Sequence, residues 1–428
     1  MLSQANNELL TRVEGDAPMG QLIRKWSWIP FALPSELKPY DAPLKVRLLG
    51  SDYVAWRTPE GKVGFIDQAC PHRRVSMALA RNEGCVLRCI FHGWTVHADG
   101  YVEDAPSHYP DAKEFASRVK VAHYPTFEAG DMVWVYLGQG DPPPRPRLPF
   151  TEMGDDHVYT TRTMAYCNYL QGVEGSLDTA HLTWLHRSFI PKLSPRAKDG
   201  SLRTGDANPI LTASAPRYEV RRTPWGMTAV GMRDNAKGKV HVRASQFVAP
   251  FITIIPSYPY GNGNFFAMVP VDDHNHIFFN GFFSLNSKVD ENWPPLQMTL
   301  GNGRLVKENY APLLGGTEIN FGQDRVAMSN GHFTGFPNNL VEEDMVVQVS
   351  MGSITDRSKE NLSSSDFGLV QMRMMMLRAL KNDAEGKHPL APNDGDFIWD
   401  DAMPIDAVIP PDGDLDALLT RQREAASA

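Results

Sequence analysis

The sequence predicts an α+β protein, in which a small all-β domain precedes a larger domain of helices packed on an antiparallel sheet. Short β-rich runs, separated by glycine and aspartate, recur from Leu44 to Leu137. A proline-dense stretch at residues 138–149 is too stiff, and too poor in backbone donors, for a helix interior or a central strand. Beyond it the chain contains both helical periodicity and long β-rich runs.

The proline-dense stretch divides the chain into two expected domains, residues 1–149 and 150–428. The first should open with a short helix at residues 17–30, before the β-rich runs. In the second we expect helical structure at 166–187, strands across 212–285 with a turn at Asp272–Asn275, and a strong helix at 366–382. Serines at 363–365 offer hydroxyls that can cap this last helix.

The composition is that of a globular protein with a sizeable core. The 428 residues are 42% hydrophobic and 21% charged, and the net charge of −8 argues against an extended nucleic-acid surface. No run of about 18 apolar residues occurs, so we expect no membrane span. Residues 1–16 lack the apolar segment of a signal peptide, so a cytoplasmic location is expected.

Three of the four cysteines crowd into twenty residues, which indicates metal binding rather than a disulfide framework. Cys70 and His72 form a Cys-x-His pair, and sixteen residues later Cys89 and His92 form a Cys-x-x-His pair. Two thiolates and two imidazoles are the ligands of a Rieske [2Fe–2S] centre, in which the cysteines hold one iron and the histidines the other. These four residues are therefore the predicted cluster ligands.

A zinc site is the alternative, because zinc also takes two cysteines and two histidines. Zinc fingers group cysteine with cysteine and histidine with histidine, whereas each pair here is mixed. Cys85 and Cys167 have no place in the pattern and are expected to be small buried apolar residues. Trp94 is expected to cover the cluster.

A second metal-binding pattern lies in residues 174–186, EGSLDTAHLTWLH. Glu174, Asp178 and His181 are spaced to share one helix face. His186 follows His181 by five residues, so a small irregularity in the helix would bring both imidazoles to one ion. Two histidines and one carboxylate form the facial triad of non-haem Fe(II) oxygenases, which leaves positions open for O₂ and substrate.

The carboxylate ligand of this second site has to come from elsewhere in the chain. We expect it to be Asp344, in the segment VEEDMVVQ. Glu343, Asp356 and Asp324 are the competing acids.

Taken together, the two patterns resemble the large subunit of Rieske ring-hydroxylating oxygenases over nearly the whole chain. The resemblance is closest to the phthalate 4,5-dioxygenase branch, through the segments NELLTRV, ACPHRR, LRCIFHGW and SMGSITDRSKENLSSSD. Before the last segment that branch usually has a pattern similar to QD…QESMG, which supports Asp344 as the iron carboxylate. Glu343 stands here for the usual glutamine and Val349 for the usual glutamate, departures that concern the substrate more than the iron.

The resemblance implies a catalytic domain of the helix-grip type, assembled as a trimer or as stacked trimers. It implies a separate NADH-dependent reductase that carries FMN and a plant-type [2Fe–2S] cluster. This agrees with the lack of a GxGxxG segment after a strand in this chain. In the family, electrons cross between subunits, so Asp178 would connect His181 to the neighbouring subunit's cluster ligand that matches His92. Glu174 would lie beside the iron without firmly ligating it.

The expected reaction is hydroxylation of an aromatic carboxylate similar to phthalate. A carboxylate in a largely apolar pocket needs a cation, and the fork geometry of arginine suits it best. Arg243, on the strand VHVRASQFV, is the expected contact, with Arg217 as the alternative. Competing functions are an O-demethylase or N-dealkylase monooxygenase, a stand-alone Rieske electron carrier, and a zinc-stabilised binding protein without redox activity.

Overall fold

The computed structural model describes residues 2–193, 208–235, 237–257, 262–290, 316–390 and 402–419. They form two compact units. The small unit comprises Val13–Arg145 and Val269–Asp273, and the large unit comprises Met1–Arg12, Pro146–Met268 and His274–Ala428. The division at Arg145 falls inside the proline-dense stretch, while residues 1–12 and 269–273 group differently from the two ranges expected from the sequence.

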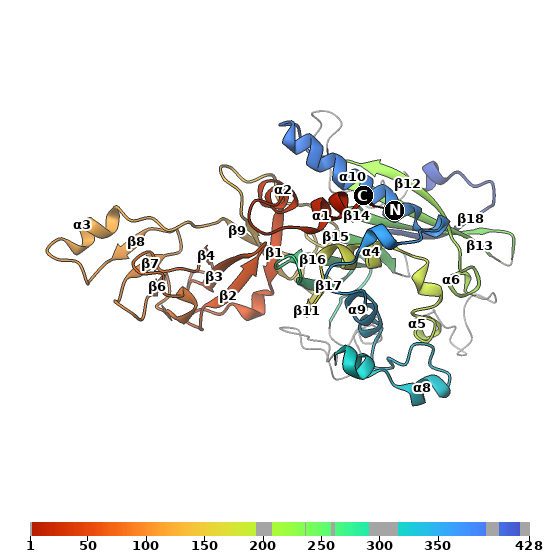
Figure 1. Ribbon diagram of the computed structural model, residues 1–428, viewed down its shortest axis with the longest axis horizontal. Coiled ribbons are helices and arrows are strands. Elements are labelled where there is room, and N and C mark those ends of the chain that lie inside the picture. The colour runs from red at the N-terminus through yellow and green to blue at the C-terminus, as the bar shows by residue number, and fades with distance from the viewer. Residues whose placement is uncertain are drawn as a thin grey trace. The chain divides into compact units, whose positions relative to one another are not determined.

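The small unit contains three antiparallel sheets, and strands dominate it (Figure 1). In their hydrogen-bonded order, the sheets are β1 (Trp28–Ala32), β10 (Met132–Tyr136), β9 (Thr126–Ala129); β2 (Leu44–Leu48), β3 (Ser51–Arg57), β4 (Val63–Asp67); and β5 (Arg81–Asn82), β6 (Val86–Arg88), β7 (Thr95–His97), β8 (Val102–Asp104). The helical segments are α2 (Pro18–Trp26), α3 (Ala112–Ser117), and the short 3₁₀ turns η1 (Pro34–Glu36) and η2 (Met77–Leu79).

The helix expected at residues 17–30 is too long, because it ends at Trp26. Pro18 at its first position needs no backbone donor, and Arg24 in its last turn lies at the negative end of the helix dipole. From Trp28 the chain is fully buried and extended, and it pairs with β10. A buried partner strand therefore overrides the helical periodicity of this segment.

The large unit is built on one antiparallel sheet of eight strands. The order is β11 (Val158–Ala165), β17 (His276–Ser284), β16 (Asn262–Pro270), β15 (Ile252–Ser257), β14 (Val240–Val248), β13 (Gly226–Asp234), β12 (Arg217–Thr223), with β18 (Ile405–Ile409) also paired to β14. Strands occupy the β-rich region predicted from the sequence, and the predicted turn at Asp272–Asn275 joins β16 to β17.

Helices of the large unit are distributed along the sequence on both sides of the strand region. They are α1 (Gln4–Thr11), α4 (Tyr169–Leu177), α5 (Ile190–Leu193), α6 (Pro209–Thr212), α8 (Arg325–Ser329), α9 (Leu340–Ser350), α10 (Phe367–Ala384), and the 3₁₀ segments η3 (Asp155–His157), η4 (His181–Thr183), η5 (Thr317–Gly322), η6 (Arg357–Lys359) and η7 (Ser364–Asp366). The strong helix predicted at 366–382 is α10, and the preceding serines form η7. The predicted α+β class is confirmed, and no helix in the described ranges is both long enough and apolar enough to cross a membrane.

Strand β14 separates two different environments in the large unit. Its residues Val240, Val242 and Ala244 join an apolar cluster with Ile405 and Leu419. The opposite face points toward α4, which packs on β15 and β14 (Figure 1).

Two contacts fix which residues lie on this second face. Thr253 of β15 donates its hydroxyl to the Ser176 hydroxyl of α4 at 2.8 Å. Phe247 pairs directly with Thr253, so alternate residues of β14 counted from Phe247, namely Ser245, Arg243 and His241, share this side. We call it the inner face of the sheet.

A buried group of charges fixes the position of α4. The carboxylate of Glu174 accepts hydrogen bonds from Arg357 (2.8, 2.9 and 3.1 Å) and from Arg373 (2.7 Å). Arg373 also binds Glu360, and Arg357 donates to the Asn7 side chain of α1 at 3.0 Å. Burial acts to raise the pKa of Glu174, but the two guanidinium groups hold that pKa below its ordinary value. The carboxylate is therefore charged and paired, and it ties α4 to α1, η6 and α10.

We predict that Glu174→Ala lowers the free energy of unfolding by about 3–5 kcal/mol, because it leaves two buried guanidinium groups without their shared partner. Arg217→Ala is the matched control. Arg217 pairs with Asp234 at 3.0 Å in an exposed position, and such pairs contribute only about 0–1 kcal/mol. Urea unfolding followed by tryptophan fluorescence measures both, and an equal effect of the two variants would contradict the assignment.

Candidate metal centres

Two loops of the small unit have the same backbone geometry. In the first, the Cys70 N–H donates to the Val75 carbonyl at 2.8 Å and the Cys70 carbonyl accepts from Arg74 at 2.9 Å. In the second, the Cys89 N–H donates to the Trp94 carbonyl at 2.8 Å and the Cys89 carbonyl accepts from Gly93 at 3.0 Å. Arg74 (φ 64°) and Gly93 (φ 74°) occupy equivalent left-handed positions. Each loop therefore holds its cysteine and its histidine on the same backbone conformation.

The four predicted cluster ligands lie together at the ends of these loops. Both cysteines are buried, and the rings of His72 and His92 have centroids 4.6 Å apart. Burial raises the pKa of the Cys70 thiol, and the adjacent Cys89 thiol adds to the rise. The Nδ1 atoms of both histidines are buried and have no hydrogen-bond partner among the described residues. Paired thiols and two unpaired imidazole nitrogens fit a cluster that binds these atoms.

The surroundings of the loops differ in part from the expectation. Trp94 stacks on the His72 ring, with 4.8 Å between centroids, and its indole donates to the Ser107 hydroxyl at 2.9 Å. Cys167 is buried as predicted. The prediction that Cys85 is buried was wrong, because Cys85 is only half-buried and its thiol lies 3.4 Å from the Glu60 carboxylate.

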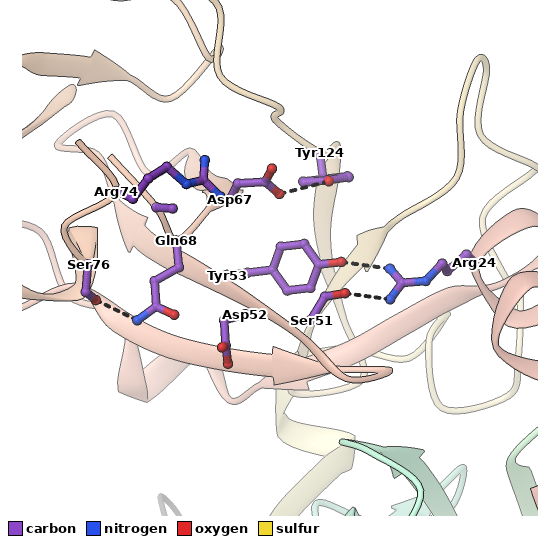
Figure 2. A pocket seen from close by; sticks show the side chains of 10 residues that line it. Arg24, Ser51, Asp52, Tyr53, Asp67, Gln68, Arg74, Ser76 and Tyr124 are labelled. Carbon is purple, nitrogen blue, oxygen red and sulfur yellow. Dashed lines mark hydrogen bonds between the residues drawn. The ribbon is translucent and has the colours of Figure 1, made fainter. Parts of the chain in front are cut away.

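A polar pocket of about 580 Å³ lies beside the first loop (Figure 2). Arg24 donates to the Tyr53 hydroxyl at 2.7 Å and to the Ser51 hydroxyl at 3.0 Å. Figure 2 shows the side chain of Gln68 directed to the Ser76 hydroxyl, to which it donates at 2.5 Å. The Gln68 carbonyl also accepts from the Met77 N–H. Gln68, on one side of the pocket, therefore connects the two ends of the Cys70 loop.

In the large unit, the structure brings His181, His186 and Asp344 together. One potential ligand atom from each lies within 4.8 Å of the others. The Nε2 atoms of His186 and His181 lie 3.1 and 3.9 Å from the same Asp344 oxygen. α4 ends at Leu177 and the separate turn η4 begins at His181, which supplies the helix irregularity predicted from the spacing of the two histidines. Two imidazoles and a carboxylate in this arrangement fit a facial iron site.

Each histidine of this group is held through its other ring nitrogen. Nδ1 of His186 lies 2.8 Å from Glu343, and both side chains are buried. Nδ1 of His181 lies 3.4 Å from Asp178. A carboxylate in this position orients the ring and directs Nε2 to the metal. Glu343, a competing ligand in the sequence prediction, therefore occupies the opposite side of His186 from Asp344.

The same carboxylates influence protonation of the metal-free site. Burial acts to lower the pKa of His186, but Asp344 and Glu343 overcome it and raise that pKa to about 9. Burial raises the pKa of Glu343. Since a metal must replace a proton on Nε2, we expect iron uptake by these residues to be weaker at lower pH.

Asp178 is positioned by more than its neighbour His181. One of its oxygens accepts from the Ala180 N–H at 2.7 Å and from the Tyr218 hydroxyl at 3.3 Å. The Tyr218 oxygen in turn accepts from the Thr179 N–H at 2.9 Å. No local pattern in the sequence indicated Tyr218, because it comes from β12 and reaches the turn only through the fold.

The remaining candidate residues lie apart from this metal group. Asp324 caps α8 and Asp356 caps η6, so each uses its carboxylate on a helix end. Glu174 is occupied by Arg357 and Arg373, and it is not among the three clustered ligands. We therefore interpret Glu174 as a structural residue, in place of the catalytic position expected for it beside the iron.

The two candidate arginines have different environments. Arg243 is buried on the inner face, where it donates to Asp406 at 2.7 Å and to the Pro256 carbonyl at 3.0 Å. Arg217 is exposed and pairs with Asp234.

We predict that Cys70→Ala and His92→Ala abolish the red-brown visible spectrum, because each removes a predicted ligand of the [2Fe–2S] cluster. His181→Ala should keep that spectrum and lose only the third iron. Absorbance and iron analysis of the purified variants measure this, and a Cys70→Ala protein that kept its colour would exclude the assignment.

We also predict that Asp344 and Glu343 differ. Asp344→Ala removes a predicted ligand and should leave the mononuclear site empty, whereas Glu343→Gln should weaken iron binding by about 10- to 100-fold, as is usual for a residue that orients a ligand. Iron titration of the metal-depleted protein separates the two. The roles would be reversed if Glu343→Gln lost all mononuclear iron and Asp344→Ala retained it.

Comparison with protein families assigns both parts of the chain. Residues 27–125 match the Rieske [2Fe-2S] domain, and residues 135–428 match the LigXa C-terminal domain like family. The chain is 39% identical to the phthalate 4,5-dioxygenase oxygenase subunit of Pseudomonas putida, across 89% of this chain and 86% of that one. It is 33% identical to the 3-chlorobenzoate-3,4-dioxygenase oxygenase subunit of Comamonas testosteroni, across 91% and 92%.

Solved structures share the fold at low sequence identity. The terminal oxygenase of carbazole 1,9a-dioxygenase from Nocardioides aromaticivorans IC177 aligns with a TM-score of 0.55 at 17% identity, covering 90% of this chain and 98% of that one. The match over the second domain excludes a stand-alone electron carrier, and the Rieske match excludes a zinc-stabilised binding protein. The chain belongs to the Rieske non-haem iron oxygenases, as an oxygenase component that carries a [2Fe–2S] cluster and a mononuclear iron.

Proposed function

We propose that this oxygenase hydroxylates an aromatic carboxylate of the phthalate type, as a dioxygenase. The observation that carries the proposal is Arg243, a buried cation on the inner face of the sheet, on the side that packs against α4. A buried guanidinium is well suited to a carboxylate, because it forms charge-assisted hydrogen bonds in a fixed plane. The two relatives named above are, by their names, oxygenases of phthalate and of 3-chlorobenzoate, both aromatic carboxylates.

The protein side chains hold and orient the reacting groups. When bound, the cluster supplies electrons one at a time and the mononuclear iron supplies O₂ activation. His181, His186 and Asp344 would provide three ligands to the iron and leave its remaining coordination positions open for O₂ and substrate. Glu343 and Asp178 hold a proton on the outward Nδ1 atoms, so that each Nε2 keeps its lone pair for the metal.

The electron donor is proposed to be a separate NADH-dependent reductase with FMN and a plant-type [2Fe–2S] cluster. Solved structures with this fold include oxygenase–ferredoxin complexes of carbazole 1,9a-dioxygenase, which supports an external iron–sulfur donor. We propose a homotrimer or stacked trimers, acting in the cytoplasm, with Asp178 connecting His181 to His92 of a second copy. The Asp178 side chain is one-fifth exposed, so it remains open to such a contact.

Removal of an alkyl group is the second candidate function. The chain is 27% identical to the 5,5'-dehydrodivanillate O-demethylase oxygenase subunit of a Sphingobium species, across 91% of this chain and 83% of that one. An O-demethylase or N-dealkylase would use the same metal residues on an aromatic ether or amine. Mass analysis of the product distinguishes the two, because dioxygenation adds both oxygen atoms while demethylation releases formaldehyde.

We predict that Arg243→Ala raises the KM for phthalate by at least tenfold, since a charge-assisted hydrogen bond contributes about 1.5–3 kcal/mol. Arg217→Ala should leave the KM unchanged, because its side chain is exposed and paired with Asp234. Steady-state kinetics with phthalate, isophthalate and benzoate make the comparison. Normal kinetics in Arg243→Ala would favour a substrate without a carboxylate.

We predict that Asp178→Asn slows electron transfer between the two metal sites by orders of magnitude while both sites still assemble, because no ligand is changed. The measurement is a single turnover of fully reduced enzyme with O₂ and substrate, following cluster reoxidation by absorbance. Tyr218→Phe is the matched control for loss of one hydrogen bond to the same carboxylate, and its effect should be smaller. Reoxidation at the wild-type rate in Asp178→Asn, with iron content verified, would exclude the connecting role.

A further inference from the structure

The inner face of the large sheet carries a buried polar cluster that the iron site does not account for. Its members come from three adjacent strands: Arg233 of β13, His241 and Arg243 of β14, and Asp406 of β18. Register places them on one face, since Arg233 pairs with His241 and Asp406 pairs with Arg243. Arg233 donates to the carbonyl and hydroxyl oxygens of Thr179. The polar cluster therefore contacts the segment that contains the metal-binding histidines.

Most donors of this polar cluster are used within the protein. The Arg233 guanidinium donates hydrogen bonds to Thr179 and to the Ala213 carbonyl. Asp406 accepts from Arg243 at 2.7 Å and lies 2.9 Å from Nε2 of His241. One carboxylate thus fixes the orientation of two neighbouring side chains.

Two nitrogen atoms of the polar cluster are not used in this way. Nε of Arg243 and Nδ1 of His241 are buried, and neither finds a hydrogen-bond partner in the part of the chain that the structure describes. The residues themselves are only 9% and 6% exposed. Buried polar atoms are nearly always paired, so two such atoms on adjacent positions of one strand face indicate a ligand contact.

The unpaired guanidinium nitrogen identifies the class of ligand. The Nε–H of Arg243 can only donate a hydrogen bond, so the partner that it lacks is an acceptor. Burial and the nearby charge of Arg243 lower the pKa of Arg233 to about 10, against the opposing effect of Asp178 and Asp406. A carboxylate accepts such a bond with the added strength of opposite charge.

We propose that His241 is a second substrate-binding residue. In the complex both of its ring nitrogens carry a proton, so that Nε2–H donates to Asp406 and Nδ1–H donates to the substrate carboxylate, which also accepts from Nε–H of Arg243. Asp406 positions both side chains. This inference rests on the proposed function and deepens it, because it assigns the carboxylate two contacts instead of one. The pairing of β18 with Val240–Ala244 of β14 places Asp406 opposite Arg243, where it can position both side chains.

The test uses variants that separate the two nitrogens of His241. The amide nitrogen of glutamine stands near the position of histidine Nε2, so His241→Gln keeps the contact with Asp406 and loses Nδ1. The amide nitrogen of asparagine stands near Nδ1, so His241→Asn restores the donor to the substrate. Calorimetric titration of the iron-loaded enzyme with phthalate, and with the uncharged dimethyl phthalate, gives the affinities without turnover. Arg217→Ala is the surface control.

We expect His241→Gln to weaken phthalate binding about tenfold or more, and to change dimethyl phthalate binding by less than about twofold. His241→Asn should recover much of the phthalate affinity. Equal weakening for both compounds would show a merely structural role and overturn the inference, as would wild-type phthalate affinity in His241→Gln. If the wild-type enzyme bound no aromatic carboxylate, the proposed function would fail together with the inference, whereas binding that is insensitive to His241 leaves the proposed function intact.

Discussion

A single buried carboxylate, that of Glu174, determines where helix α4 lies. Glu174 sits in the middle of α4 and is held by two guanidinium groups, while the end of the same helix leads into Asp178 and His181. Because unpaired charge in a protein interior is so unfavourable, α4 can take only the position in which both arginines reach it. The metal ligands inherit their placement from this requirement, and so do α1 and α10, which supply or contact the partners of Glu174.

Ligands close together in sequence were predictable, and partners far apart were not. The two Cys/His pairs and the His181–His186 spacing are local patterns that constrain one loop or one turn. Arg357 and Arg373 lie 183 and 199 residues beyond Glu174, so nothing in the segment 174–186 could show that the Glu174 carboxylate is already occupied. Tyr218 and Asp406 escaped prediction for the same reason, since each reaches its partner through strand register.

Helix α9 shows a different limit of sequence reasoning. Glu342, Glu343 and Gln348 are buried on it, so polar residues occupy the side that would normally be apolar and the helical pattern is lost. Glu343 holds His186 and Asp344 belongs to the metal group, so the apolar pattern is interrupted where the proposed chemistry lies. In contrast, α10 contributes no residue to the metal group, and its position was predicted almost to the residue.

The pairing of β18 with β14 brings in the positioning residue Asp406 from a part of the chain that is separate from the metal-binding residues. Residues 402–410 contribute Asp406 to the inner face, and His181, His186 and Asp344 lie far from them in sequence. The corresponding segment of a relative can therefore replace residues 402–410 without changing any of the three metal-binding residues. Such chimaeras offer a route by which substrate preference diverges, in nature or in the laboratory, while the oxygen chemistry of the enzyme is retained.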